Sequence, residues 1–219
     1  VVVMGHGGCG KTTLVEAIAY QTGITARMGK VTDGNTISDY DKEEQKRQFS
    51  ISTSVVPVEF EDIKINFLDT PGYFDFVGEV EEACHAAGAA VIVINGKSGV
   101  EVGTLKAWEL CEKYKLPRLF FVTGMDDDQA SYRKIVLELN DRFGRKVAPF
   151  HVPIRENEKF VGFVNVVKMK GRRFINDTSE YEECDIPDYM DKHLNISRDA
   201  LVELSLIHIS EPTRPEPIS

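Results

Sequence analysis

Apolar residues in the first two thirds of the chain alternate between short continuous runs and helical spacing. Short β-branched or continuous apolar runs indicate buried strands, whereas apolar positions three or four residues apart indicate one face of a helix. This pattern predicts strands at residues 1–4, 51–60, 63–68, 89–94 and 119–122, and helices at 11–21, 75–87, 101–114 and 129–143. Two adjacent strands followed by alternating helices and strands predict an α/β fold, with a mostly parallel sheet and helices on both faces.

Two parts of the chain depart from this alternation. Residues 23–49 have no sustained apolar period and are rich in Gly, Asp, Lys and Glu, so we expect a long mobile loop. After Pro153 the pattern predicts part of an inserted α+β subdomain. Its expected elements are a hairpin of residues 161–169 and 172–174 turning at Lys170-Gly171, an acidic stretch at 176–191 and a helix at 198–203. A short strand at 147–151 is expected to end the part of the chain before it. We therefore expect one domain at residues 1–153 and the beginning of a second at 154–203.

The last residues differ in character from everything before them. Residues 204–214 resemble the translation of a transposon-type sequencing adapter, and the remainder is rich in proline. We exclude residues 204–219 from the fold argument as a non-native tail, and a genuine flexible C-terminus is the alternative. Since the chain also opens without an initiator methionine, we expect it to be a piece of a longer protein.

Composition narrows the class of protein. Of 219 residues, 42% are hydrophobic and 28% charged, which excludes a wholly disordered chain. There is no apolar run long enough to cross a membrane and no signal peptide, so we expect a cytoplasmic protein without a membrane partner. The net charge of −9 argues against non-specific binding to nucleic acid through bulk charge, so we expect no direct DNA binding. It does not exclude a nucleic-acid partner reached through a local basic face. The four cysteines lack metal-ligand spacing and are expected to be reduced thiols.

A phosphate-binding motif lies between the first strand and the first helix. The residues Gly5-His6-Gly7-Gly8-Cys9-Gly10-Lys11-Thr12 match the pattern G-x-x-x-x-G-K-S/T. Glycines let backbone N–H groups approach phosphate oxygens, and the helix that follows directs its positive end at them. Lys11 would contact the β- and γ-phosphates, the Thr12 hydroxyl would bind Mg²⁺, and we include Thr13 among the nucleotide-binding residues. The alternative is a glycine turn without a ligand.

Cys9 lies inside this motif and raises a separate question. A helix N-terminus lowers the pKa of a nearby thiol, so a redox switch is conceivable. The favoured interpretation is a small residue that fits the loop.

A second motif, Asp69-Thr70-Pro71-Gly72, directly follows the strand at 63–68. An aspartate at a strand end can hold Mg²⁺ through water, and a glycine N–H can meet the γ-phosphate. Together with the phosphate loop, this motif indicates a nucleotide switch rather than a kinase.

At this point the sequence resembles the translational GTPases, most nearly elongation factor G and its close relatives, from residue 1 to about 203. The segments that carry the resemblance are Gly5-His6, Gly10-Lys11-Thr12-Thr13-Leu14, Ser38-Asp39-Tyr40-Asp41, Arg47-Gln48-Phe49-Ser50-Ile51-Ser52, Asp69-Thr70-Pro71-Gly72-Tyr73-Phe74-Asp75-Phe76 and Asn95-Gly96-Lys97-Ser98-Gly99-Val100-Glu101. The resemblance implies a phosphate-loop GTPase fold that binds GTP or GDP with Mg²⁺. It also implies that Ser50 joins Thr12 and Asp69 as a Mg²⁺ ligand, and that residues 23–49 form a switch loop. The implied partner is the ribosome, which would stimulate hydrolysis by a monomer.

Three departures from the family pattern bear on function. Tyr73 follows Gly72 where the family usually has a histidine that orients the attacking water, and a phenol is a poor base at neutral pH. The guanine-reading motif N-K-x-D becomes Thr123-Gly124-Met125-Asp126, in which Asp126 still accepts from guanine, Thr123 stands in for asparagine and Gly124 lowers affinity. The later Ser-Ala guanine loop is absent. Of the acids after Met125, Asp128 is expected to cap a helix and not to bind a metal.

The leading interpretation is a GTPase in which Lys11, Gly72 and Tyr73 act in hydrolysis. A nucleotide-binding regulator with little or no hydrolysis is the second hypothesis, supported by Tyr73 and Gly124. The third is an ATP-using phosphate-loop enzyme, against which Asp126 argues.

Overall fold

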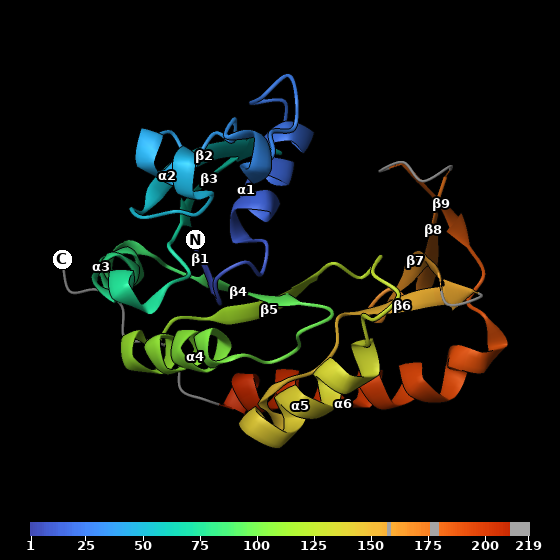
Figure 1. Ribbon diagram of the computed structural model, residues 1–219. Coiled ribbons are helices and arrows are strands. Elements are labelled where there is room, and N and C mark those ends of the chain that lie inside the picture. The colour runs from blue at the N-terminus through green and yellow to red at the C-terminus, as the bar shows by residue number, and fades with distance from the viewer. Residues whose placement is uncertain (157–158, 176–179, 211–219) are drawn as a thin grey trace. The chain divides into compact units, whose positions relative to one another are not determined.

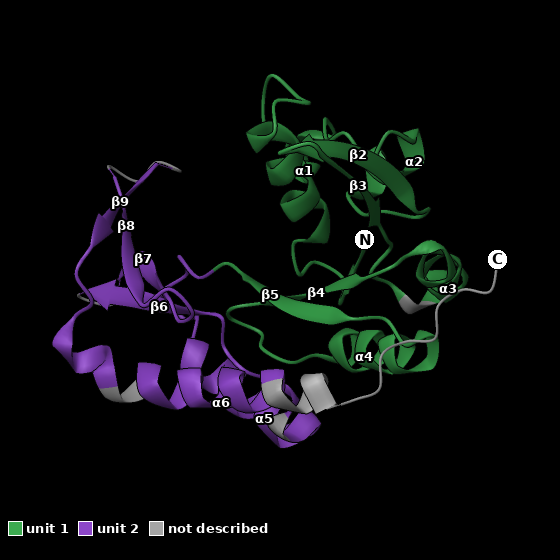
Figure 2. Ribbon diagram, turned by 180° about the vertical axis from the view of Figure 1, so that it is seen from behind, with its two compact units in different colours: residues 1–124 green, residues 125–219 purple. Residues whose placement is uncertain are grey.

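The computed structural model describes residues 1–156, 159–175 and 180–210 (Figure 1). The chain divides into two compact units, residues 1–124 and 125–219, each with its own sheet and core (Figure 2).

The first unit is built on a five-stranded sheet. Its strands are β1 (Val2–Gly5), β2 (Ser54–Phe60), β3 (Ile63–Asp69), β4 (Ala90–Asn95) and β5 (Arg118–Thr123). Their order is β2-β3-β1-β4-β5. All neighbours run parallel except the β2–β3 hairpin. The predicted α/β fold with a mostly parallel sheet is confirmed.

Helices cover both faces of this sheet. They are α1 (Lys11–Gln21), α3 (Val77–Ala86) and α4 (Val102–Tyr114), with a short 3₁₀ turn, η2 (Phe74–Phe76), before α3. Successive residues of a strand point to opposite faces, so β1 contributes to two cores. Val2 and Met4 pack with α3 and α4, whereas Val3 packs with α1.

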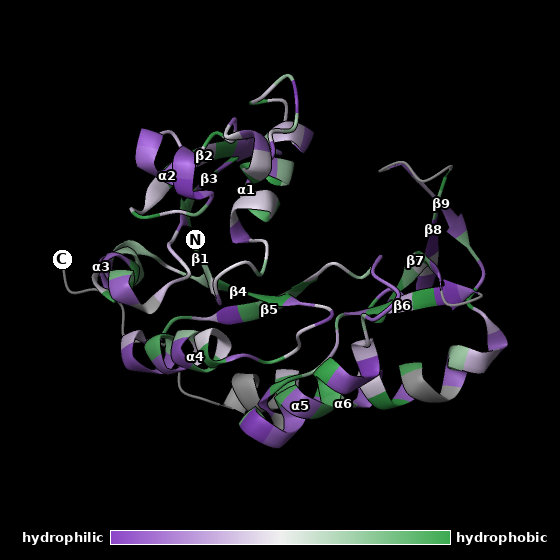
Figure 3. Cartoon of the chain, viewed as in Figure 1, coloured by the Kyte–Doolittle hydropathy of each residue, from purple (hydrophilic) through white to green (hydrophobic). Residues whose placement is uncertain are grey.

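Residues 23–49, expected as a loop, contain regular structure. They include η1 (Val31–Asp33) and α2 (Lys42–Arg47). The Asp41 carboxylate accepts from the Glu43 amide at 2.7 Å, and the Glu44 carboxylate accepts from the Asp41 amide at 3.3 Å. This reciprocal capping stabilises a six-residue helix that is almost wholly hydrophilic (Figure 3). Because such a helix has no apolar face, its sequence shows no periodic apolar positions from which a helix could be predicted.

Trp108 of α4 packs against the sheet. Its indole stacks on Phe120 with ring centroids 5.7 Å apart, and the Arg118 guanidinium lies 3.7 Å from the ring centroid. Both partners belong to β5, so the indole joins α4 to the sheet.

The second unit combines an antiparallel sheet with helices. Its elements are α5 (Tyr132–Phe143), η3 (Gly144–Lys146), β6 (His151–Glu156), β7 (Lys159–Asn165), β8 (Lys170–Phe174), β9 (Tyr181–Cys184), η4 (Asp188–Met190) and α6 (Asp191–Ser210). The strand order is β6-β7-β8-β9. Tyr132 of α5 packs on the core that includes Ile154 and Leu194. Because α5 packs in this core, the compact units divide after Gly124, earlier than the expected division after residue 153.

Several local predictions in this unit were wrong. The strand expected at 147–151 begins only at His151, and the acidic stretch at 176–191, for which no strand was predicted, contains β9. The hairpin turns before Lys170, because the Asn165 side chain accepts from the Lys168 amide at 2.8 Å and Met169 takes a left-handed conformation (φ 50°). Ser131, not Asp128, caps α5 by accepting from the Lys134 amide at 3.4 Å.

The C-terminal part extends the predicted helix. α6 continues to Ser210, beyond the residue at which the sequence pattern ended, and the rest of the expected tail, residues 211–219, lies outside the described residues. Within the described part of the chain, no helix is both long and apolar enough to cross a membrane. The four cysteines are free thiols.

Candidate functional site

The glycine-rich loop joins β1 to α1 and wraps around one ammonium group. Lys11 is 6% exposed, and its Nζ donates to the carbonyls of Gly5 at 3.3 Å and His6 at 3.0 Å. The N-cap of α1 is Gly10, no acidic residue lies in the first turn, and Thr13 is exposed there. The start of α1 therefore presents backbone N–H groups and a cation without a competing carboxylate, which suits an anion.

The second motif lies directly against this loop. The Thr70 hydroxyl donates to the Val3 carbonyl at 2.7 Å and ties the motif to β1. A Cβ on Gly72 would press on Lys11 Nζ and lie 2.8 Å from the Gly7 nitrogen. Only glycine permits this approach, so the structure brings together Gly72 and Lys11, two residues that sequence analysis assigned to the phosphates.

A buried cluster of oxygen atoms lies next to Lys11. The hydroxyl oxygens of Thr12 and Ser50 are 3.2 Å apart, and the Ser50 hydroxyl donates to Asp39 Oδ1 at 2.7 Å. These three residues and Asp69, at the end of β3, are each at most 8% exposed.

Several oxygens of this cluster lack partners within the described chain. They are both carboxylate oxygens of Asp69, Oδ2 of Asp39 and Oγ of Ser38. Burial raises the pKa of Asp69 to about 6, opposed by the hydroxyls of Thr12 and Ser38 and by the charge of Lys11. Burial likewise raises the pKa of Asp39.

Buried oxygens without partners are costly, and a hard divalent cation satisfies them. Hydroxyl and carboxylate oxygens are the donors that Mg²⁺ prefers, so the residues present fit the implied metal. Sequence analysis named Thr12, Ser50 and Asp69 but missed Asp39 as a member of this cluster. Asp39 and Ser50 lie eleven positions apart with α2 between them, and no spacing rule links such a pair.

Tyr73 lies beside the phosphate loop. Its ring carbons come within 3.3 Å of where a Cβ on Gly7 would lie, and its centroid is 4.7 Å from that of Phe49. The side chain is 47% exposed. The phenol is thus held against the loop by an aromatic partner from the segment that also carries Ser50.

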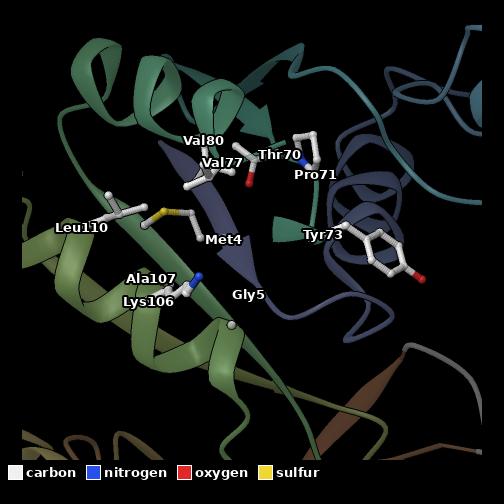
Figure 4. Close-up of a pocket in the computed structure, with 12 residues that line it drawn as sticks. Met4, Gly5, Thr70, Pro71, Tyr73, Val77, Val80, Lys106, Ala107 and Leu110 are labelled. Carbon is white, nitrogen blue, oxygen red and sulfur yellow. The ribbon is translucent and has the colours of Figure 1, made fainter. Parts of the chain in front are cut away.

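A small cavity lies behind the Gly72-Tyr73 turn, between β1, α3 and α4. Its lining side chains are mostly apolar: Met4, Val77, Val80, Ala107 and Leu110. Figure 4 shows the Tyr73 ring turned away from them. None of the predicted Mg²⁺ ligands lines this cavity, so it is separate from the oxygen cluster.

The residues expected to read the base lie in different units. Thr123 ends β5, and its hydroxyl donates to the Cys9 carbonyl at 2.7 Å and lies 3.3 Å from the Ile94 carbonyl. Thr123 thus braces the phosphate loop from the end of β5, two strands away from β1. Asp126 is exposed in a turn of the second unit.

We expect Thr123→Val to weaken this brace. The substitution keeps the side-chain shape but removes the hydroxyl that satisfies the Cys9 carbonyl, and such a loss costs about 1–2 kcal/mol. Urea unfolding monitored by circular dichroism measures the change. Thr53→Val, which removes a hydroxyl bonded to the Glu79 carbonyl at 3.2 Å in a part-buried position, serves as a matched comparison outside the loop. If Thr123→Val has the same unfolding free energy as the unsubstituted protein, the Thr123 hydroxyl does not stabilise the loop.

The other residues of the phosphate loop are buried in it, lie near Glu101 or are exposed at its tip. Cys9 is 2% exposed, and burial raises the pKa of its thiol, which supports the packing interpretation over a redox switch. His6 Nε2 lies 3.6 Å from the Glu101 carboxylate at the start of α4. Gly8 is exposed at the loop tip.

Comparisons with known proteins bear on the family and the fold of the chain. Residues 1–204 match the family model described as the elongation factor Tu GTP binding domain. The chain is 36% identical over 203 residues to elongation factor G of Chlamydia caviae, an alignment that covers 92% of this chain and 29% of the relative. A crystal structure of a protein from Thermus thermophilus superimposes with a TM-score of 0.87 at 33% identity, covering 98% of this chain and 33% of that one. The chain thus spans about a third of the length of these relatives.

Proposed function

The chain belongs to the family of elongation factor Tu GTP-binding domains, and from this premise we propose that it binds GTP and GDP with Mg²⁺ and hydrolyses GTP to GDP and phosphate. The observation that carries the proposal is the buried oxygen cluster of Thr12, Asp39, Ser50 and Asp69 beside the Lys11 ammonium. Oxygen atoms suited to a metal cation lie next to a loop suited to phosphate, and a nucleoside triphosphate with its Mg²⁺ needs both.

Each part of the site has a proposed role. Lys11 and the backbone N–H groups from Gly5 to Thr13 bind the phosphates. The oxygens of Thr12, Ser50 and Asp69, with Asp39 behind Ser50, hold Mg²⁺. The metal, when bound, neutralises charge on the phosphate oxygens. Gly72 offers its N–H to the γ-phosphate, where it lies against Lys11.

The reaction needs no covalent intermediate. Water adds to the γ-phosphorus as the bond to the β–γ bridging oxygen breaks, and positioning supplies most of the rate. We propose that the Tyr73 hydroxyl orients this water, held by the Phe49 ring. We further propose that Asp126 would accept hydrogen bonds from guanine and that Thr123 supports the phosphate loop through its hydrogen bond to the Cys9 carbonyl.

The relatives support a proposal for the biological setting. We propose that the domain belongs to an elongation factor G-like translation factor, a cytoplasmic monomer whose hydrolysis the ribosome stimulates and which supports movement along messenger RNA. The named relative from Chlamydia caviae is an elongation factor G. Because this chain covers 29% of that relative, the properties of the whole factor are proposals for this chain.

Nucleotide competition tests the chemistry of the site. We expect GDP to displace a fluorescent GDP analogue at concentrations about 100-fold below those of ADP, because an aspartate that accepts two guanine hydrogens is left unpaired by adenine. Fluorescence anisotropy in the presence of Mg²⁺ measures both. If ADP displaces the analogue at the same concentrations as GDP, the proposal of a GTPase is wrong and an ATP-using enzyme is favoured.

Ribosome titration tests hydrolysis and the role of Tyr73. We expect ribosomes to raise phosphate release by the unsubstituted protein, and Tyr73→His to raise it further by about tenfold, because imidazole titrates near neutral pH. Tyr20→His, at an exposed position of α1, is the matched control. Unchanged release on adding ribosomes, with GDP binding intact, would indicate the non-hydrolysing regulator.

A further inference from the structure

Glu16 is a buried carboxylate that the proposed chemistry does not use. It lies on α1 and is 2% exposed. Its Oε1 accepts from the Gly29 amide at 2.8 Å, and its Oε2 accepts from the Ile37 amide at 2.7 Å. Charge-assisted hydrogen bonds of this kind are short and strong when water is excluded. One side chain thus holds the backbone at two points eight residues apart.

The segment between these points fits the carboxylate closely. A Cβ on Gly29 would lie 2.7 Å from Glu16 Oε1 and 2.5 Å from the Asn35 carbonyl oxygen. The Lys30 amide donates to Asn35 Oδ1 at 2.7 Å and closes the segment on itself. Residues 29–37 therefore form a closed loop whose two ends rest on Glu16.

This loop leads directly into the oxygen cluster. Ile37, whose amide Glu16 holds, packs on the core and is followed by Ser38 and Asp39. The Ser38 carbonyl accepts from the Ser54 hydroxyl at 2.6 Å, and Asp39 Oδ1 accepts from Ser50 at 2.7 Å. A shift of the Ile37 backbone would displace Asp39 and, through it, the Ser50 hydroxyl.

A second buried glutamate holds the other side of Ser50. Glu44 of α2 is 2% exposed, and its Oε1 accepts from the amides of Ile51 at 2.9 Å and Ser52 at 3.1 Å. Glu44 belongs to the same segment that it stabilises. Glu16 differs, because it belongs to the helix that begins with Lys11 and Thr12.

We propose that Glu16 is a positioning residue that sets Asp39 and Ser50 in register with Thr12 for Mg²⁺. The inference rests on the proposed function, since it presumes that the oxygen cluster binds the metal. Helix α1 begins with Lys11 and Thr12. Through Glu16 the same helix holds the segment that carries Asp39 and Ser50. The residue touches neither nucleotide nor metal.

The test is the Mg²⁺ dependence of nucleotide retention in Glu16→Gln. The amide keeps the volume of the side chain but has one acceptor oxygen and no charge, so one backbone N–H loses its partner. We expect the Mg²⁺ concentration at half-maximal retention of the fluorescent GDP analogue to rise about tenfold, from loss of one charge-assisted bond. Val15→Ala, in the core beside Glu16, should lower the melting temperature without moving this midpoint.

A second variant and a second readout keep the outcomes separate. Gly29→Ala should move the midpoint in the same direction, because its methyl group would press on the Glu16 carboxylate. Amide hydrogen exchange should accelerate over residues 37–50 in both variants and not in Val15→Ala.

An unchanged midpoint in Glu16→Gln and Gly29→Ala, in protein that retains GDP, would overturn the positioning role. If the unsubstituted protein shows no Mg²⁺-dependent retention, the proposed function fails instead. In that case the positioning of Asp39 and Ser50 for Mg²⁺ falls with it, and accelerated exchange over residues 37–50 would show only that Glu16 holds this segment.

Discussion

Replacing Asp69 by Asn should stabilise the ligand-free protein at pH 7.5 and at the same time weaken Mg²⁺-dependent nucleotide retention. Both oxygens of Asp69 are buried without partners among the described residues, and burial raises its pKa from 3.8 to about 6. At neutral pH the folded protein must therefore bury a charge that the hydroxyls of Thr12 and Ser38 and the Lys11 ammonium offset only in part. Asn carries no charge and removes that cost.

The sign and size follow from the linkage of protonation to folding. A carboxyl whose pKa is higher in the folded state stabilises the fold while protonated, and this contribution is lost as the pH rises from about 4 to about 6. The shift in the pKa of Asp69 corresponds to about 3 kcal/mol as an upper bound on the gain from Asp69→Asn. Between pH 4 and 6 the unfolding free energy of the unsubstituted protein should fall relative to that of the variant.

Urea unfolding at several pH values measures this difference without Mg²⁺ or nucleotide. Glu59→Gln, at an exposed position of β2, makes the same carboxylate-to-amide change and should leave the pH profile unaltered. The GDP retention midpoint in Mg²⁺ should rise at least tenfold in Asp69→Asn, because a charged oxygen ligand is lost. An Asp69→Asn profile that follows the unsubstituted protein would place its carboxylate in contact with water.

Lys11→Met should lower the affinity for GTP and GDP by about 100-fold or more. The ammonium is buried where the loop carbonyls and Gly72 surround it, so few other groups can supply its charge. Loss of charge-assisted bonds to two phosphates corresponds to about 3 kcal/mol. Methionine fills similar space, so the fold should survive.

Isothermal titration with GDP and Mg²⁺ measures the affinity of this variant. Lys64→Met, at an exposed position of β3, controls for removing one positive charge. Should Lys11→Met bind GDP as tightly as the unsubstituted protein, the loop between β1 and α1 would not be the phosphate site.

The parts of the fold that sequence predicted best are those with a strong apolar signal. The helix at 11–21 matches α1, and the run at 89–94 differs from β4 by one residue at each end. Both are governed by burial against the sheet, which apolar periodicity reports directly. The family and the phosphate-loop GTPase fold implied by the resemblance were likewise confirmed by the comparisons.

The parts that sequence missed are stabilised by polar contacts. The helix α2 depends on the Asp41–Glu44 capping pair, and the turn before Lys170 depends on the Asn165 side chain. Asp39 joins the oxygen cluster through a hydrogen bond to Ser50, formed only once α2 has turned the chain back. Such contacts depend on three-dimensional placement, which no short spacing pattern encodes. The predicted roles of the site residues stay predictions until the variants above are measured.

The packing of Trp108 has a practical consequence for following how this chain unfolds. It is the only tryptophan in the sequence, and its ring neighbours Arg118 and Phe120 both lie in the first compact unit. Tryptophan fluorescence therefore reports on the unfolding of that unit. Far-ultraviolet circular dichroism instead reports on the helices and strands of both units. Two denaturation curves that coincide would mean that the units melt as one, and curves that separate would assign the earlier or later transition to the unit that carries the indole.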